Sequence, residues 1–433
     1  MWNKDVECAS LDEMQSWQTK RLKDTLQRVY DNVPFYKRNF DQAGFNPNDF
    51  KELGDLGKLP FTLKNDLRDN YPFGLCAVPM PEVVRVHASS GTTGRPITGT
   101  YTIDDVRNWA ECCARVITAC GIGQGDIIQV AYGYGLFTGG LGIHGGAEPV
   151  KCTVVPTSSG ITERQVTLMR DFGVDALFCT PSYALTIADK ASEMGVDIAQ
   201  FKIRSGCFGA EPWSDEMRRE IETRMGIKAF NIYGLTELMG PGMSFSCNSQ
   251  DGWLHVNEDH VYPEIIDPVT EEALPLGEIG ELVFTGITRQ AMPLIRYRTR
   301  DISALDRTPC PYCGRTLIKM KKVSGRTDDM IIVSGVNVFP SQIESLLLET
   351  PEVEPQYVIV VRKKGYLDAL SVDVEAKAHI FEQGQEVMQA IAQKVEKRIH
   401  GVIGIHVGVR LVAPRSIQRS EGKAKRVFDT RNL

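Results

Sequence analysis

Residues 89–96 carry the octapeptide Ser-Ser-Gly-Thr-Thr-Gly-Arg-Pro, which joins an alternating, β-rich run at 83–87 to a second extended run at 97–102. This pattern predicts a loop between two strands. Glycines let backbone N–H groups approach phosphate oxygens, hydroxyls donate further hydrogen bonds, and an arginine neutralises charge. The loop therefore has the chemistry of a nucleotide-phosphate site, formed by Ser89, Ser90, Gly91, Thr92, Thr93, Gly94 and Arg95.

This loop differs from the P-loop of ATPases and kinases. A P-loop needs a Gly-Lys-Ser/Thr run that opens a helix, whereas here Gly94 is followed by Arg95, Pro96 and an extended run. Clusters of Ser, Thr and Gly are also common in polar surface hairpins that bind nothing. The octapeptide alone leaves both interpretations open, and the rest of the chain decides between them.

Strand-like and helix-like segments alternate after this loop. Thr102 and Asp105 predict a helix start, apolar residues recur up to residue 120, and a buried strand is expected at 127–132. The next strand–helix units are expected at 152–155 with 164–172, and at 176–179 with 181–194. This alternation predicts a layered α/β core.

The last hundred residues have a different pattern. A chain of 433 residues exceeds the size at which one hydrophobic core usually stops growing, so more than one domain is expected. The C-terminal segment predicts an α+β arrangement. Its expected elements are a helix from Ser341, strands at 357–361 and 370–374, a helix at 386–400 and a strand at 407–412.

The composition excludes several classes of protein. A hydrophobic share of 42% and a charged share of 24% are ordinary for globular proteins, and a net charge of −6 without a basic block gives no case for nucleic-acid binding. No apolar run reaches bilayer-spanning length, and the N-terminus lacks the apolar core of a signal peptide. We therefore expect a cytoplasmic protein without a membrane partner. Its eleven cysteines, mostly in apolar segments, predict reduced packing residues.

The segments at 206–212 and 229–237 are expected to be strand ends that break into glycine turns, the position where open α/β sheets bind ligands. Glu237 lies just beyond the second strand, and its carboxylate would reach a Mg²⁺ held by phosphates. A solvated carboxylate is the alternative. Asp301 ends a segment that contains three arginines, which indicates a structured polar site and an acceptor for ribose hydroxyls. Ordinary surface ion pairs are the alternative there.

A separate cysteine pattern predicts a zinc site. Cys310 and Cys313 are separated by two residues in a Pro/Gly loop, the spacing of a zinc knuckle, and Cys247 and His255 offer a second pair of ligands upstream. Such an S₃N site would be closed and structural. His260 is the alternative fourth ligand, but we prefer His255, because His260 belongs to a Glu-Asp-His string of the fold's framework. Two free thiols in a tight turn are the other interpretation.

Five motifs, in order, resemble those of the adenylate-forming (acyl-CoA synthetase) superfamily. They are the loop at 89–96, Tyr-Gly-Leu-Thr-Glu at 233–237, Tyr-Arg-Thr-Arg-Asp at 297–301, Ser-Gly-Arg-Thr-Asp-Asp at 324–329 and Gly-Lys at 422–423. Strings at 258–266, 334–342 and 419–427 are similar to the phenylacetate–coenzyme A ligase branch. Arg95 departs from the lysine common in the superfamily, which keeps the charge but changes its geometry.

The resemblance implies an AMP-forming acid–thiol ligase that uses ATP, Mg²⁺ and coenzyme A, as in phenylacetate catabolism. An arylacetic acid, phenylacetate first among them, would form an acyl-adenylate with release of pyrophosphate, and the thiol of coenzyme A would then displace AMP. Lys423 would bridge the acid and the α-phosphate, Glu237 would bind Mg²⁺, and Arg326 would contact ribose or phosphate. The implied nucleotide site is Gly209, Ala210, Glu211, Pro212, Asn231, Tyr233, Gly234, Thr236, Asp301 and Arg326.

The resemblance also implies two domains, a large N-terminal adenylation domain at 1–327 and a small mobile C-terminal domain at 328–433. Asp328 would be the hinge between them. Turning the small domain between the half-reactions would withdraw Lys423 and bring Ser334 and Gly335 toward the thiol channel, where glycine leaves room for pantetheine. The family further suggests a homodimer.

An aromatic segment rich in glycine provides the candidate pocket for the acid, because aromatic edges with glycine gaps suit an aryl ring. Its candidate residues are Tyr132, Tyr134, Phe137 and Gly139, with Pro241 opposite. An aromatic core turn is the alternative interpretation of this segment. Two other functions remain: transfer of another aryl acid to a carrier-protein thiol, and a nucleotide-binding regulatory homologue without activity.

Overall fold

The computed structural model describes residues 1–89, 96–249, 251–327, 331–333, 336–364, 367–420 and 424–431. The chain forms two compact units. Unit 1 comprises Met1–Cys179, Gln200–Ala210 and Lys228–Lys322, and unit 2 comprises Thr180–Ala199, Glu211–Ile227 and Val323–Leu433. The expected hinge between residues 327 and 328 stays a prediction, because compactness does not reveal which part turns.

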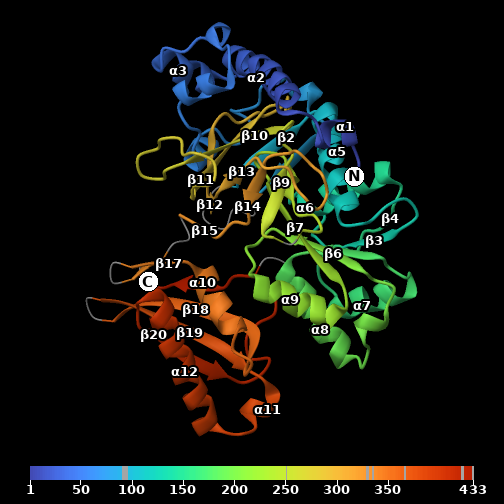
Figure 1. Ribbon diagram of the computed structural model, residues 1–433, viewed down its shortest axis with the longest axis vertical. Coiled ribbons are helices and arrows are strands. Elements are labelled where there is room, and N and C mark those ends of the chain that lie inside the picture. Colours follow the sequence, from blue (N-terminus) through green and yellow to red (C-terminus); the bar gives the residue numbers. More distant parts are fainter. Residues whose placement is uncertain are drawn as a thin grey trace. The chain divides into compact units, whose positions relative to one another are not determined.

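A nine-stranded sheet forms the centre of unit 1 (Figure 1). Its order is β13-β14-β9-β8-β7-β6-β5-β3-β4. The strands span β3 (Ile127–Val130), β4 (Thr153–Val155), β5 (Ala176–Cys179), β6 (Ser205–Gly209), β7 (Lys228–Leu235), β8 (Gly240–Phe245), β9 (Trp253–Val256), β13 (Leu305–Asp306) and β14 (Lys319–Lys321).

The sheet changes from parallel to antiparallel pairing at β7. Strands β4, β3, β5, β6 and β7 run parallel, whereas β8 and β9 continue antiparallel. Every residue of β5 and β6 is buried, as expected for a parallel sheet covered on both faces. The carboxyl ends of β6 and β7 therefore lie side by side, which is the predicted place for a ligand site.

The helices of unit 1 span α1 (Lys4–Glu7), α2 (Leu11–Asn32), α3 (Pro34–Gln42), α4 (Lys64–Asp69), α5 (Ile103–Ala119), α6 (Gly139–Val150) and α7 (Thr162–Asp171). Two of these helices, α5 and α7, begin within two residues of where the sequence predicts them. The expected helix start at Thr102 is confirmed: its hydroxyl accepts the N–H of Asp105 at 3.1 Å, and the Asp105 carboxylate accepts the N–H of Thr102 at 2.9 Å. This capping box satisfies backbone donors that the helix leaves unpaired.

Helix α6 was not predicted, because its sequence Gly-Gly-Leu-Gly-Ile-His-Gly-Gly-Ala-Glu-Pro-Val has poor helix propensity. Packing explains why it forms. A Cβ on Gly142 would lie 2.4 Å from Cζ2 of Trp109, and one on Gly146 would lie 2.3 Å from Cβ of Cys113. Glycine therefore lets α6 pack closely against α5, which also contacts β8 (Figure 1).

Two smaller sheets complete unit 1. The strands β1 (Arg85–Ala88) and β2 (Thr98–Tyr101) form the hairpin that was predicted around the octapeptide. The strands β10 (Val261–Ile266), β11 (Gly280–Gly286) and β12 (Tyr297–Ser303) pair antiparallel in that order. All of β11 is buried, so β12 has a rigid neighbour.

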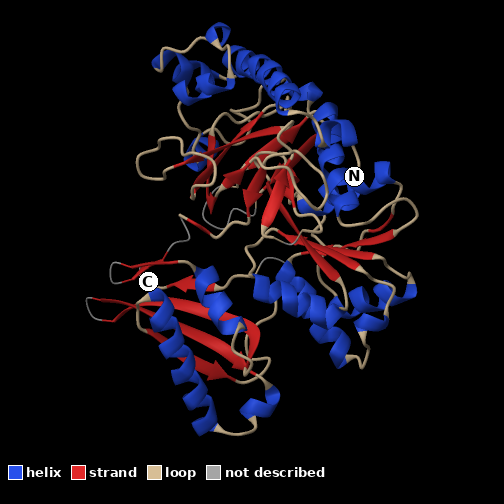
Figure 2. Ribbon diagram, viewed as in Figure 1, coloured by secondary structure: helices blue, strands red, loops and turns tan. Residues whose placement is uncertain are grey.

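Unit 2 is α+β in its C-terminal part, as predicted. Strands β18 and β19 pair antiparallel, β20 and β21 join them in parallel, and α10 and α12 pack on this sheet (Figure 2). Apolar side chains of these elements form one buried cluster. The elements are α8 (Pro181–Glu193), α9 (Asp215–Met225), β15 (Gly325–Arg326), β16 (Ile331–Val333), β17 (Val336–Val338), α10 (Pro340–Leu348), β18 (Val353–Lys364), β19 (Leu367–Ala376), α11 (Ala378–Phe381), α12 (Gln385–Ile403), β20 (Val407–Val412) and β21 (Val427–Asp429).

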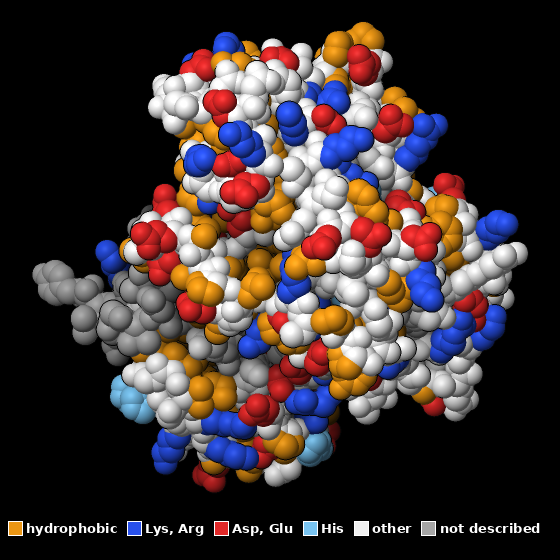
Figure 3. Space-filling view, turned by 45° about the horizontal axis from the view of Figure 1, so that its top comes forward, with side chains coloured by type: hydrophobic (Ala, Val, Ile, Leu, Met, Phe, Trp, Pro, Cys, Tyr) orange, Lys and Arg blue, Asp and Glu red, His pale blue; other side chains and the backbone are white. Residues whose placement is uncertain are grey.

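Positive and negative side chains are intermixed on the face of the molecule shown in Figure 3. In the described part of the chain, the helices include none with the length and apolar character needed to cross a bilayer. All eleven cysteines are free thiols, as the sequence predicted.

Candidate active site

The predicted nucleotide site in unit 1 begins at the carboxyl ends of β6 and β7. Gly209 is the last residue of β6, and a Cβ there would lie 2.2 Å from the carbonyl oxygen of Ile232 in β7. Ala210 follows in the left-handed conformation, with φ 71°. The glycine thus allows close strand pairing, and the chain turns sharply directly after it.

The sequence placed Gly234 in a glycine turn, and this is wrong. Tyr233 and Gly234 still belong to β7 and pair with Ser244 and Pro241 of β8. A Cβ on Gly234 would lie 1.9 Å from the carbonyl oxygen of Gly240, so only glycine fits this pairing. The turn comes later, where the N–H groups of Leu238 and Met239 both donate to the carbonyl of Leu235. Asn231 lies in the same strand.

This turn carries Thr236 and Glu237, and both are buried. The Thr236 hydroxyl lies 3.2 Å from that of Thr138 at the start of α6, and the Thr236 carbonyl accepts the phenol of Tyr101 at 3.2 Å. Arg289 donates to the carbonyl oxygens of Glu237 and Leu238. The backbone around Glu237 is therefore fixed by hydrogen bonds from the side chains of two distant residues, Tyr101 and Arg289.

The carboxylates of Glu237 and Asp301 each accept a tyrosine hydroxyl. The Tyr297 hydroxyl donates to Oε1 of Glu237 at 2.7 Å, and the Tyr233 hydroxyl donates to Oδ2 of Asp301 at 2.6 Å. Asp301 is also buried, and its N–H donates to the Thr299 hydroxyl at 3.0 Å. Carboxylate oxygens in such positions suit ribose hydroxyls and a hard cation such as Mg²⁺.

The three arginines near Asp301 are paired with other carboxylates. Arg296 pairs with Glu264 at 3.0 Å, and both Arg298 and Arg300 pair with the fully buried Glu281, at 2.8 and 3.4 Å. These pairs hold β12 in place. The expected polar site exists. Its arginines, however, form ion pairs with other carboxylates, and the group that contacts Asp301 is the hydroxyl of Tyr233.

The aromatic segment before α6 brings part of the predicted acid pocket together. A Cβ on Gly139 would lie 2.5 Å from Cε1 of Phe137 and 3.1 Å from Cβ of Tyr132, so these three residues are in contact. Phe137 is 40% exposed, which leaves an aromatic surface available to a ligand. Tyr134 contacts Gly140 and lies 3.2 Å from Nδ1 of His144, and burial raises the pKa of its phenol.

Pro241, also predicted for this pocket, packs against α6 at Gly142. Its Cγ would lie 2.8 Å from a Cβ on Gly142, and its carbonyl oxygen accepts the indole N–H of Trp109 at 2.9 Å. No sequence signal predicts that Trp109, Thr138 and His144 contribute to this region. Their positions depend on α6, a helix that propensity does not predict.

Other predicted site residues lie in unit 2. Glu211 accepts the N–H of Ser182 at 2.8 Å and the N–H of Ala424, the residue after Lys423, at 2.9 Å. Desolvation raises the pKa of this carboxyl, and these two bonds oppose the rise. Pro212 is exposed, and Arg326 lies in β15.

Several predicted residues lie outside the described residues. They are Ser90, Gly91, Thr92, Thr93, Gly94, Arg95, Asp328, Ser334, Gly335 and Lys423. Ser89 is described, and it closes the base of the octapeptide loop. Its hydroxyl accepts the N–H of Ile97 at 3.0 Å, and its own N–H donates to the Ile97 carbonyl at 2.9 Å.

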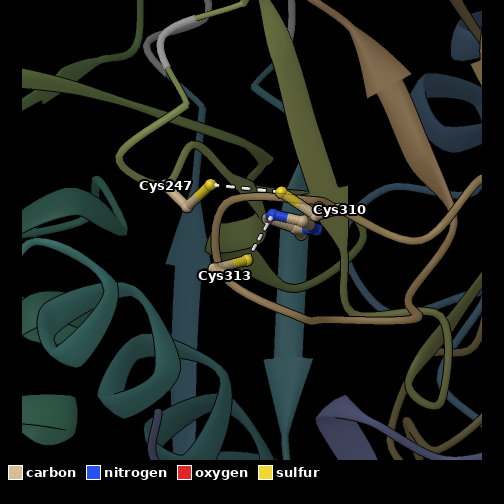
Figure 4. Close-up of side chains that lie close together, drawn as sticks. Cys247, Cys310 and Cys313 are labelled. Carbon is tan, nitrogen blue, oxygen red and sulfur yellow. Dashed lines mark hydrogen bonds between the residues drawn. The ribbon is translucent and has the colours of Figure 1, made fainter.

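The predicted zinc ligands of unit 1 come together as a compact cluster. Cys247, His255, Cys310 and Cys313 place their ligand atoms within 4.8 Å of one another. The sulfurs of Cys247 and Cys310 are 3.7 Å apart, and Nε2 of His255 is 3.4 Å from the sulfur of Cys313 (Figure 4). Sulfurs around a tetrahedral Zn²⁺ at about 2.3 Å lie about 3.7 Å apart, so the donor set fits this metal.

The structure distinguishes the two candidate histidines. His260 lies elsewhere, with Nδ1 2.9 Å from the Thr288 hydroxyl and Nε2 3.2 Å from Asp259. The preference for His255 over His260 therefore agrees with the geometry. Contacts with Cys247 and His255 lower the pKa of the Cys313 thiol, which favours the thiolate that a metal requires.

Comparisons with known proteins agree with this geometry. The family model of AMP-binding enzymes matches residues 83–292, and the model of the AMP-binding enzyme C-terminal domain matches residues 335–431. The site and the fold thus define an adenylate-forming enzyme. Phenylacetate-coenzyme A ligase of Escherichia coli (strain K12) is 50% identical over 99% of this chain and 97% of its own length. The enzyme of that name from Thermus thermophilus is 46% identical over the whole of both chains.

A solved structure of 2-hydroxyisobutyryl-CoA ligase in the postadenylation state, in complex with R3-HIB-AMP, has a TM-score of 0.93 at 29% identity, over 99% of this chain and 92% of that one. The chain belongs to the phenylacetate–coenzyme A ligase family of AMP-binding enzymes. It is an AMP-forming acid–thiol ligase that works through an acyl-adenylate, with ATP and coenzyme A as co-substrates.

Proposed function

We propose that this ligase activates phenylacetate, or a close arylacetate, and joins it to coenzyme A. The observation that carries the proposal is the pair of buried carboxylates, Glu237 and Asp301, fixed by tyrosine hydroxyls at the carboxyl end of the parallel sheet. The identity of about half with ligases named for phenylacetate supports the choice of acid.

In the first half-reaction, the carboxylate of the acid attacks the α-phosphorus of ATP, which brings two anions together. Asp301 would accept the ribose hydroxyls, and the loop at 89–95 would donate to the phosphates. Lys423 would neutralise the charge between the acid and the α-phosphate. A Mg²⁺ held by Glu237 would supply further positive charge at the phosphates.

The exposed aromatic ring of Phe137, packed with Tyr132 and Gly139, supports an aryl ring as the acyl group. A flat ring stacks on such a surface, whereas a long alkyl chain would need a tunnel. Tyr134, whose phenol lies beside His144, would mark the polar edge of the same pocket. Pro241 would line the opposite wall.

In the second half-reaction, the thiol of coenzyme A displaces AMP from the acyl-adenylate. We expect the C-terminal domain to turn about Asp328, so that Ser334 and Gly335 replace Lys423 beside the reacting atoms. The remaining predicted nucleotide contacts, including Arg326 and Glu211, would belong to the first state. Glu211 already holds the N–H of Ala424, next to Lys423 in the chain.

The cluster of Cys247, His255, Cys310 and Cys313 would hold one structural Zn²⁺. Four protein ligands leave no open position for a substrate, so the metal would join two loops without taking part in the reaction. Arg315, whose buried guanidinium is ion-paired with Glu7 at 2.6 Å, lies beside Cys313 and would donate a hydrogen bond to its thiolate.

The eleven free cysteines support a reducing compartment, and we propose the cytoplasm. The homodimer suggested by the family stays a prediction, which sedimentation of the purified protein would test.

One assay tests the main proposal. The purified protein is mixed with Mg-ATP, coenzyme A and a panel of arylacetates, benzoates and fatty acids, and AMP and thioester are quantified. We expect AMP and thioester in equal amounts, with phenylacetate among the best acids. AMP without thioester would favour a carrier-protein acceptor, and no turnover with any acid would favour a regulatory homologue.

A further inference from the structure

The two site carboxylates and their two tyrosines form a crossed arrangement within unit 1. Tyr233 and Glu237 are four residues apart on β7 and its turn, and Tyr297 and Asp301 are four residues apart on β12. The hydrogen bonds run between these segments: Tyr297 donates to Glu237 at 2.7 Å and Tyr233 donates to Asp301 at 2.6 Å. Each tyrosine therefore contacts the carboxylate of the other segment.

These bonds have the length of strong, charge-assisted hydrogen bonds between a hydroxyl and a carboxylate. Tyr297, Glu237 and Asp301 are shielded from water, with exposed fractions of 2%, 8% and 3%, whereas Tyr233 is half-buried. A buried carboxylate that loses a donor is poorly satisfied, because no bulk water replaces the bond. Each phenol therefore strongly favours one orientation of its carboxylate.

The tyrosine rings are themselves held in place. Tyr297 pairs with Phe284 across β11 and β12, and the ring of Tyr233 lies 6.2 Å from the ring of the same Phe284. Strand β7 belongs to the nine-stranded sheet, whereas β12 belongs to the sheet of β10 and β11. The crossed bonds thus connect two sheets at the point where the predicted ligands of ATP and Mg²⁺ lie.

We propose that Tyr297 is a positioning residue for Glu237 and that Tyr233 is a positioning residue for Asp301. This inference rests on the proposed function, in which Glu237 binds Mg²⁺ and Asp301 binds ribose. Tyr297 engages Oε1 of Glu237, whose carboxylate would bind the cation, and Tyr233 engages Oδ2 of Asp301, whose carboxylate would bind the ribose. The Mg²⁺ requirement then depends on Tyr297, which lies in the same strand as the proposed ribose ligand Asp301. The affinity for ATP depends on Tyr233, which lies in the same segment as the proposed Mg²⁺ ligand Glu237.

The test is ATP–pyrophosphate exchange, which reports the first half-reaction alone, measured against Mg²⁺ and against ATP. We expect Tyr297→Phe to raise the Mg²⁺ concentration at half-maximal exchange by about tenfold while the apparent KM for ATP, at saturating Mg²⁺, changes by less than about twofold. Tyr233→Phe should raise the apparent KM for ATP by about tenfold and change the Mg²⁺ concentration at half-maximal exchange by less than about twofold. Unchanged Mg²⁺ dependence in Tyr297→Phe, or equal effects of both variants on both ligands, would overturn the inference.

Tyr36→Phe is the matched control for loss of a buried hydroxyl. Tyr36 is 2% exposed, and its hydroxyl contacts the Thr62 hydroxyl at 3.1 Å and the N–H of Ile295 at 3.1 Å. We expect it to lower the melting temperature about as much as Tyr297→Phe does, and to leave both dependences unchanged. A Mg²⁺ shift in this control as well would assign the effect of Tyr297 to general packing.

A double-mutant cycle separates this inference from the proposed function. If Tyr297 acts through Glu237, then Tyr297→Phe has little further effect on exchange when Glu237 is already Gln. Full additivity would overturn the inference. If Glu237→Gln and Asp301→Asn both leave exchange unaffected, the proposed roles of the carboxylates fail instead, whatever the tyrosine variants do.

Discussion

At the scale of single residues, the buried histidine at position 260 shows how the fold sets a protonation state. Burial lowers the pKa of His260 to about 4, against an ordinary value of 6.5, although the neighbouring Asp259 opposes this shift. The imidazole is therefore neutral in the folded protein at neutral pH. Arg115, bonded bidentately to Asp259 at 2.8 and 3.0 Å, supplies the positive charge that this carboxylate needs.

This protonation state makes stability depend on pH. Between pH 6.5 and pH 4 the unfolded chain binds a proton at this residue and the folded chain does not, so stability falls as the pH falls through this window. We expect the change from pH 7 to pH 5 to cost about 2 kcal/mol through His260. Urea unfolding at both pH values measures it, with His260→Gln reducing the loss and the exposed His379→Gln leaving it unchanged. Equal losses in all three proteins would contradict this assignment.

At this scale, the sequence predicted which residues belong to the site better than it predicted their hydrogen-bond partners. It singled out Glu237 from its position just beyond a strand and Asp301 as the end of an arginine-rich segment, and it grouped Cys310 and Cys313 with Cys247 and His255 from ligand chemistry. It did not find that the Tyr297 phenol reaches Glu237, because this bond joins two different sheets and no spacing in one segment encodes it.

At the scale of elements, α6 shows where local propensity misleads. Its glycines weaken the helix in isolation, yet they permit the close contact with α5 that holds α6 next to the predicted acid pocket and next to Pro241 of β8. By contrast, the boundaries of β5 and β20 agree with prediction to the residue, because apolar runs between polar turns leave little choice. The sequence pattern thus predicted β5 and β20 well, whereas packing against α5 explains why α6 forms.

Two glycines of α6 give a matched test of this explanation. Gly142→Ala should destabilise the protein by about 1–3 kcal/mol, because its Cβ would meet the Trp109 ring at 2.4 Å. Gly145→Ala, whose nearest neighbour would be 4.0 Å away, should be neutral or stabilising by up to about 1 kcal/mol. Thermal and denaturant unfolding of the two variants provide the comparison. A gain of similar size in both would show that propensity, not packing, dominates in α6, and a similar loss in both would contradict the role given to the Trp109 contact.

The cysteine knuckle gives a second prediction at this scale. We expect one zinc per chain by mass spectrometry of the metal, and its removal by a chelator should expose three additional thiols to a thiol reagent. The N-terminal segment should then become sensitive to protease, because Thr316, close to the knuckle, holds the carbonyl oxygens of Glu7 and Ala9.

Cys310→Ser should reproduce the effect of metal removal, whereas Cys120→Ser, which removes a buried thiol outside the cluster, should retain the metal. A protein that holds no zinc after purification without chelators would contradict the proposed site.

At the scale of the whole molecule, the two half-reactions need different groups beside the same adenylate. We expect Lys423→Ala to slow acyl-adenylate formation by about a thousandfold or more, because a positive charge is then missing between two anions. Thioester formation from preformed acyl-adenylate should be nearly unaffected. Single-turnover measurements of each step provide the test, and equal losses in both steps would contradict the alternation of the C-terminal domain.

The order of the motifs along the chain predicted the class of enzyme better than any single motif did. The octapeptide alone has two interpretations. Only the four motifs that follow it, up to Lys423, indicate an adenylate-forming enzyme. The location of the domain hinge stays a prediction from the motif at 324–329, because a hinge is defined by what moves and compactness alone does not show movement. The compact units cut the chain after Lys322, while the motif places the hinge at Asp328.

The close fit between α5 and α6 has a consequence for anyone who wants this enzyme to accept new acids. Enlarging the side chains of α6 that face α5 would damage the scaffold before it reshaped the pocket. Useful diversity must therefore come from the aromatic positions ahead of the helix, where Phe137 is partly exposed and can be shortened or replaced. A combinatorial library that varies Tyr132, Tyr134 and Phe137 while leaving Gly142 and Gly146 untouched would contain mostly folded members.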